Sequence, residues 1–273
     1  MTPGAANKSD IRTRQKQREE TLLLQNAPDV LQLEERKNRY ESERSVLRWG
    51  GIAGILGGIV FLFVPVILFG FIPPAPADPA GLVARFPDIR AALAAGGFVD
   101  FLAGVFWVAL LLGLYRALRR TSPAPAAWGT YLTLLGFAVI FVETMTQVAF
   151  DPISNLYHAP GVTPAQQFAL VSAWQATQGM FNQFDTSAII LESAGFIVLG
   201  VAMIRAPAFG RVLGWATSAL GALSLSAGFF LGTTSPLTAI LLIPIYVLLP
   251  IVLGWRLYSL SRSESSLVVT HGN

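Results

Sequence analysis

The chain has 273 residues, of which 53% are hydrophobic and 13% are charged, and its mean hydropathy is +0.56. A soluble domain usually carries roughly 25% charged residues, so this composition favours a membrane protein over a soluble one. The net charge of +3 is expected to reflect basic residues at membrane edges rather than a nucleic-acid surface, and the lack of cysteine excludes disulfides, thiol catalysis and cysteine-ligated metals.

The N-terminal tail, residues 1–48, holds 18 of the 35 charged residues. Residues 1–28 are polar, with clustered Lys and Arg, and are predicted to be disordered. Residues 29–48 are predicted to form a helix, with hydrophobic side chains every seven positions from Leu33 to Leu47. We expect a solvated helix that runs into the first span. A helix that binds a second copy of the chain or a protein partner remains an alternative.

Six apolar segments after this tail are long enough to cross a bilayer. A span needs about 20 residues, because a helix rises 1.5 Å per residue across a ~30 Å hydrocarbon core. The predicted spans are residues 49–71, 89–115, 128–150, 184–204, 212–231 and 237–260. The expected fold is therefore all-α: a polytopic membrane protein with a six-helix bundle over residues 49–262 and a disordered cytoplasmic tail over residues 263–273. The polar, helix-periodic residues 166–183 are predicted to extend the fourth span beyond the membrane on the extracytoplasmic side.

The basic residues predict how the bundle is oriented. Of the 19 Lys and Arg residues, all but Arg85 and Arg90 lie in the tails or in loops on one side of the predicted membrane. Because cytoplasmic segments carry an excess of Lys and Arg, both termini are predicted to be cytoplasmic.

Small residues and prolines predict how the spans pack. Lipid provides no hydrophobic drive for helix association, so small side chains must allow close contact between helices. The expected packing faces include Gly50, Gly54 and Gly58 in the first span and Gly214, Ser218, Gly221 and Ala222 in the fifth. In the sixth span, Pro244 and Pro250 each remove a backbone hydrogen bond and favour a kink.

Four carboxylates within or at the edge of the spans are the main functional signal. They are Asp100, Glu143, Asp185 and Glu192, and no Lys, Arg or His is expected at the same depth. A charge near the bilayer centre costs at least ~2.5–3.5 kcal/mol on insertion scales, so these groups must face one another, water, or a bound proton or cation. Counted along the helices, Asp185 lies near the outer interface and the other three lie deeper.

Three polar side chains extend this group of acids. Gln178 and Asn182 share one helix face with Asp185 and Glu192, and Gln147 lies one turn from Glu143. The pattern predicts a polar pocket that opens outward and is closed by the apolar cytoplasmic half of the bundle. Because close carboxylates repel one another, at least one is expected to hold a proton at neutral pH.

These residues favour a small transporter-like or solute-sensing protein that binds a proton, a cation or a cationic small solute. The alternative is a structural or partner-binding membrane subunit whose acids serve only in helix packing. A hydrolase that uses Asp100 and Asp185 is a third hypothesis, and no motif surrounds either residue. No catalytic residue, cofactor, metal site or nucleic-acid partner is predicted.

The connection between the fourth and fifth spans carries a resemblance to a known family. Residues 205–215 have the sequence RAPAFGRVLGW, and the second span ends in LYRAL at residues 114–118. This basic–Pro–Leu–Gly turn resembles that of the domain of unknown function 4386 family of prokaryotic multi-pass membrane proteins, and the similarity covers about residues 48–262. The resemblance implies a helical bundle in a prokaryotic cytoplasmic membrane, without an assigned reaction or site residues.

Overall fold

The computed structural model describes residues 38, 40–232 and 236–270. The chain divides into two units, Met1–Ser45 and Val46–Asn273. The predicted disorder of residues 1–28, and most of the helix predicted at 29–48, lie outside the described residues. Residues 40–48 are helical and continue into the first span.

The all-α, six-span fold is confirmed. Six helices in the described part of the chain are long and apolar enough to cross a membrane. They are Tyr40–Phe71, Phe86–Leu118, Pro123–Tyr157, Pro164–Ile204, Arg211–Phe230 and Ile240–Arg262. Many large apolar side chains on these helices point outward, where a bilayer would cover them, as at Trp128, Trp215 and Phe230. The cytoplasmic location of the termini stays a prediction.

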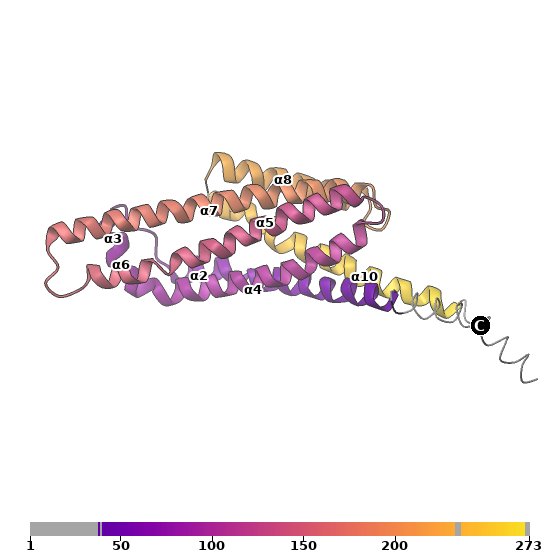
Figure 1. Cartoon of the computed structure of the whole chain (residues 1–273), viewed down its shortest axis with the longest axis horizontal. Helices are drawn as coiled ribbons and strands as arrows, with labels where there is room; N and C mark the ends of the chain where they lie inside the picture. The colour runs from indigo at the N-terminus through magenta and orange to yellow at the C-terminus, as the bar shows by residue number, and fades with distance from the viewer. Residues whose placement is uncertain (1–37, 39, 233–235, 271–273) are drawn as a thin grey trace, which may run out of the picture. The chain divides into compact units, whose positions relative to one another are not determined.

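The bundle is a series of long helices joined by short turns (Figure 1). After the helical residues 40–61, the elements in chain order are α2 (Phe63–Phe71), α3 (Pro79–Ala84), α4 (Phe86–Leu118), α5 (Pro123–Gln147), α6 (Phe150–Tyr157), α7 (Pro164–Ile204), α8 (Arg211–Phe230), α9 (Pro236–Ile243), the π-helical turn η1 (Pro244–Leu248) and α10 (Leu249–Thr270). Proline opens many of these helices, where its missing N–H costs no hydrogen bond.

Helix α7 is the longest element, with 41 residues. It begins at a capping box in which the Gln166 N–H donates to Thr163 Oγ1 and the Thr163 N–H donates to Gln166 Oε1. At 1.5 Å per residue it is about 62 Å long, twice the thickness of a ~30 Å hydrocarbon core. The polar residues 166–183 are thus continuous with the fourth span, and α7 reaches well beyond the end of α8 (Figure 1).

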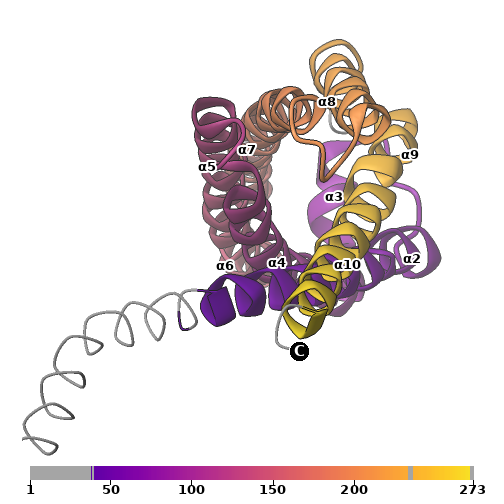
Figure 2. The same ribbon diagram turned by 90° about the vertical axis from the view of Figure 1, so that its right-hand side faces the viewer.

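Small residues bring α7 into close contact with both of its neighbours. A Cβ added at Gly195 would lie 2.8 Å from the Gly129 carbonyl oxygen of α5, and one added at Gly214 of α8 would lie 2.8 Å from the Gly200 carbonyl oxygen of α7. Figure 2 shows the resulting row, with α7 between α5 and α8. The backbones approach this closely only because side chains are missing at these positions.

The glycine stripe of the first span packs against two other spans. A Cβ added at Gly54 would lie 2.7 Å from Leu110 Cδ1 of α4 and 2.9 Å from the Pro250 carbonyl oxygen of α10. One added at Gly50 would lie 2.9 Å from the Ala109 carbonyl oxygen of α4. The first span is therefore fixed between α4 and α10 by positions that tolerate no side chain.

The sixth span is interrupted at its prolines. At the end of η1, the Leu249 N–H donates to the Pro244 carbonyl, five residues back instead of four. Pro250 has no N–H for the Tyr246 carbonyl, so the α-helical hydrogen-bond ladder cannot pass through this point unchanged. The predicted kink is thus a π-helical turn.

Helix α10 continues through residues 263–270, where the sequence analysis predicted a disordered tail. No Pro or Gly interrupts the chain between Gly254 and Gly272, so nothing local ends the helix earlier. Residues 271–273 of that tail lie outside the described part of the chain.

Gly54→Ala is expected to lower the free energy of unfolding by about 1–3 kcal/mol, because the new methyl group meets backbone atoms of α10 that cannot move aside. Gly179→Ala in α7 is the matched control: nothing lies within 4 Å of its added Cβ. It is expected to stabilise the helix by roughly 0.5–1 kcal/mol. Thermal unfolding in detergent measures both, and equal effects of the two substitutions would contradict this packing.

Candidate functional site

Glu192 is the most deeply enclosed of the predicted site residues. It lies on α7 and has no exposed surface. The Tyr246 hydroxyl of η1 donates to Glu192 Oε2 at 2.7 Å, whereas Glu192 Oε1 is buried without a hydrogen-bond partner. The side chain lies directly over Gly136 of α5, where an added Cβ would collide with its Cγ. Three spans therefore fix the position of this carboxyl group.

Two aromatic rings pack against the ring of Tyr246, whose hydroxyl binds Glu192. Tyr246 lies 5.4 Å from Phe61 and 5.5 Å from Trp107 between ring centroids. Trp107 in turn stacks on Phe137 at 5.6 Å, and its indole Nε1 is buried without a hydrogen-bond partner. An unmade hydrogen bond in such surroundings costs about 1–3 kcal/mol. Glu192 Oε1 is thus a buried acceptor that a proton or a polar ligand would satisfy.

The other three predicted carboxylates come from the same group of helices. Asp100 of α4 and Asp185 of α7 are partly buried, and Glu143 of α5 is 8% exposed. Asp185 is close enough to Asp100 and Glu143 for their charges to repel, and Glu192 interacts in the same way with all three. In the described residues no Lys or Arg forms an ion pair with Asp100, Glu143 or Glu192.

The carboxylates do not form a compact ligand shell. Among the described residues, no three His, Asp or Glu side chains are grouped closely enough to hold a metal ion. Their charges therefore interact at a distance, and the chemistry that this arrangement supports most directly is gain or loss of a proton.

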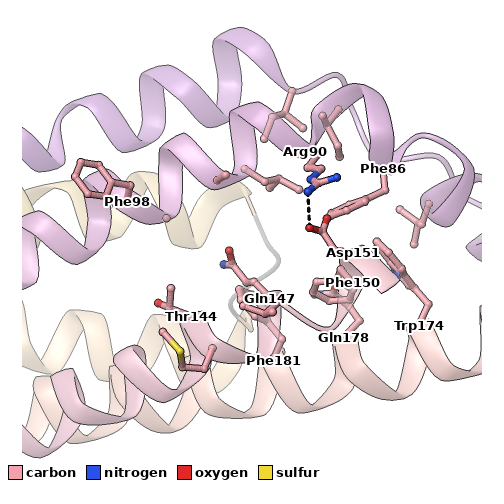
Figure 3. A pocket seen from close by; sticks show the side chains of 18 of the residues that line it. Phe86, Arg90, Phe98, Thr144, Gln147, Phe150, Asp151, Trp174, Gln178 and Phe181 are labelled. Atoms are coloured by element: carbon pink, nitrogen blue, oxygen red, sulfur yellow. Dashed lines mark ion pairs between the residues drawn. The ribbon is translucent and has the colours of Figure 1, made fainter. Parts of the chain in front are cut away.

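A pocket of about 650 Å³ lies near the end of the bundle that carries α3 and α6, between α4, α5, α6 and α7 (Figure 3). Gln147 and Gln178 are among its lining residues. Asn182 does not line it but accepts a hydrogen bond from Gln178 Nε2 at 2.9 Å. None of the four carboxylates is among its lining residues.

The pocket walls are largely apolar and aromatic. Phe150 lies 4.3 Å from Trp174, and Phe86 lies 5.1 Å from Trp174, between ring centroids. All three rings are buried. They join α4, α6 and α7 into a small second core, separate from the main core of the bundle.

Sequence analysis did not identify the charged residues of this pocket. Arg90 forms an ion pair with Asp151 at 2.8 Å, drawn as a dashed line in Figure 3. Arg85 also lines the pocket, and its Nη1 donates to the carbonyl oxygens of Pro73 and Pro74, both at 2.9 Å. One signal was available: Arg85 and Arg90 are the two basic residues that the predicted topology places on the side opposite the termini.

The pocket and the carboxylates are neighbours along the same three helices. Gln147 follows Glu143 by one turn on α5, and Gly97, which lines the pocket, precedes Asp100 by one turn on α4. A Cβ added at Gly97 would lie 3.3 Å from Gln147 Oε1, so the two helices approach each other there. A polar ligand in the pocket would thus lie near the carboxylates.

Tyr246→Phe is expected to lower the free energy of unfolding by about 0.6–1.7 kcal/mol, because it removes the donor to Glu192 inside a membrane bundle. Tyr131→Phe, whose side chain is 74% exposed, is the control and is expected to have no effect. A double-mutant cycle with Glu192→Gln isolates the pair. A coupling energy of zero would mean that the hydrogen bond adds nothing to stability.

No curated protein and no solved structure matches the chain. A family model does match, over residues 55–259, that is, from the first span to the last. It confirms the resemblance inferred from the turn at residues 205–215: the chain belongs to the family described as domain of unknown function DUF4386.

Proposed function

We propose that this protein is a transporter-like or solute-sensing bundle that binds a proton or a cation through Asp100, Glu143, Asp185 and Glu192. The observation that carries the proposal is the state of Glu192. Its carboxyl group is wholly buried, one oxygen has no hydrogen-bond partner, and three further carboxylates repel any charge on it. Ionisable groups inside a membrane are costly and usually mark ion or proton pathways.

A proton suits this arrangement better than a dehydrated metal cation. A metal ion needs several oxygen ligands at about 2–2.6 Å around one point, and no such group exists among the described residues. A proton needs only one oxygen, such as Glu192 Oε1. Repulsion among the four groups ties the protonation of each to that of the others.

The neighbouring pocket supplies a route toward the carboxylates in this proposal. Gln147 and Gln178 line it, and Asn182 continues the polar face of α7 toward Asp185. In this proposal the protein lies in a prokaryotic plasma membrane with both termini in the cytoplasm. The end of the bundle that carries α3, α6 and the pocket is then extracytoplasmic. A solute that reaches Gln147 and Gln178 would then lie one to two helical turns from Glu143 and Asp185, where it could exchange protons with them.

The alternative is a structural or partner-binding membrane subunit. The hydrogen bond between Tyr246 and Glu192 favours it, because this bond ties α7 to the sixth span whether or not a proton moves. The close glycine contacts among α5, α7 and α8 likewise serve assembly. In that case the partner surface includes the helix predicted at residues 29–48.

Glu192→Gln separates the two functions. Glutamine keeps the size of the side chain and an oxygen for Tyr246, but it cannot titrate. If Glu192 binds a proton or cation, the dependence of the melting temperature on pH or on Na⁺ and K⁺ is expected to flatten, while the protein stays folded. Fluorescence-detected unfolding of purified protein measures this dependence.

Asp88→Asn is the matched control for that experiment. Asp88 lies exposed in the first turn of α4, away from the buried acids, so its substitution is expected to leave the pH and ion dependence of the wild type intact. If Glu192→Gln behaves like this control, the acids are structural.

Deletion of residues 1–39 tests the alternative directly and retains the core residue Leu47. For a partner-binding subunit, the deletion is expected to remove a complex seen by crosslinking in native membranes. For a proton- or cation-binding bundle, it is expected to leave the ion response unchanged. A crosslinked complex that survives the deletion would count against residues 29–39 as part of its partner surface.

A further inference from the structure

The pocket between α4, α5, α6 and α7 opens sideways. Three of its lining residues, Phe98, Met145 and Val148, are 67%, 66% and 67% exposed on the protein surface. All three belong to helices that cross the membrane. Large apolar side chains exposed on a span face acyl chains, so the pocket is accessible from the bilayer as well as from its polar end.

The body of the pocket suits an apolar chain. Part of its wall is the buried ring cluster of Phe86, Phe150 and Trp174, and its volume of about 650 Å³ falls within the ~300–1,000 Å³ typical of small-molecule sites. That volume is small for a helix of a second protein, which would need a groove along several turns. A single extended chain from the lipid phase is the occupant that this shape admits.

The charged residues of the pocket carry an excess of positive charge. Arg85 and Arg90 face a single carboxylate, Asp151, which pairs with Arg90. The backbone carbonyls of Pro73 and Pro74 orient Arg85 without neutralising it, and its Nε is buried without a hydrogen-bond partner. A guanidinium group fixed in this way favours an acidic group with two oxygens, such as a carboxylate or a phosphate.

We propose that this pocket binds a single-chain membrane amphiphile with an acidic head group, whose chain lies against Phe86, Phe150 and Trp174 and whose head group binds Arg85. The inference stands apart from the proposed role of Asp100, Glu143, Asp185 and Glu192, none of which lines the pocket. A long-chain fatty acid and an anionic lysophospholipid share this chemistry.

The test uses the full-length protein in phosphatidylcholine nanodiscs and a palmitic acid that carries a photoreactive diazirine on its chain. After illumination, mass spectrometry of peptides locates the label. Labelling is expected to concentrate in the segments 86–101 and 144–151, which supply most of the lining residues of the pocket. Label spread evenly over the lipid-facing surface of all spans would overturn the proposal.

Ala94→Trp fills the pocket and is the first variant. Ala94 lines the pocket but is exposed, so a larger side chain does not disturb a core. Labelling is expected to fall about tenfold. Leu112→Trp on the same helix, at a position 49% exposed and outside the pocket, is the control and is expected to label like the wild type. Equal labelling of the two variants would exclude binding in the pocket.

Competition by unlabelled amphiphiles identifies the head group. Palmitic acid, palmitoyl lysophosphatidic acid, hexadecanol and hexadecylamine have chains of similar length but different heads. One or both of the acids are expected to compete at least about tenfold better than the alcohol or the amine, as loss of a charged hydrogen bond predicts. If palmitic acid competes better, the ligand is a free fatty acid; if palmitoyl lysophosphatidic acid competes better, the ligand is a phospholipid. Equal or better competition by the amine would overturn the acidic head group.

Two substitutions of opposite expected effect show that charge is responsible. Arg85→Gln is expected to weaken competition by the acids about tenfold without changing that by hexadecanol. Asp151→Asn releases Arg90 from its ion pair and is expected to strengthen competition by the acids. A gain of binding cannot arise from misfolding. If Asp151→Asn weakens competition by the acids or leaves it unchanged, the arginines do not bind the head group. Glu192→Gln is expected to leave labelling unchanged, so this proposal and the proposed function fail separately.

Discussion

The hydrogen bond from Tyr246 to Glu192 is the polar contact around which the neighbouring helices of the bundle pack. A carboxyl group at the centre of an apolar protein needs a donor, and here that donor comes from the π-helical turn of the sixth span. The same carboxyl group needs room, and Gly136 of α5 provides it by having no side chain. The helix contacts around Glu192 are therefore arranged by one polar group as much as by apolar packing.

The spans could be predicted from sequence because the bilayer imposes one length and one polarity on every crossing segment. The extension of α7 could also be predicted from the sequence, because residues 166–183 keep the helical periodicity of the fourth span and contain no proline. The π-helical turn was not. Two prolines predict an interruption of the helix, but they do not predict that the Leu249 N–H donates to the Pro244 carbonyl.

The candidate site, like the fold, could be predicted from the sequence only in part. Periodicity predicts that Gln178, Asn182, Asp185 and Glu192 share one face of α7, and in the structure Gln178 lines a pocket that none of the carboxylates lines. Depth along a helix does not give its rotation relative to neighbours, so sequence could not separate the pocket from the deeper carboxylates. Arg90 and Asp151 lie 61 positions apart in the chain, and only tertiary structure brings them together.

The widened turn of the sixth span has a consequence for how this helix can rearrange. An α-helix turns by about 100° per residue, so moving the five-residue hydrogen bond along the chain by one position rotates every side chain in between. Tyr246 lies inside that stretch, and its hydroxyl cannot follow such a rotation and remain on Glu192. A shift of this turn by one position would therefore break the hydrogen bond to Glu192, so the hydrogen bond favours the position that the turn occupies.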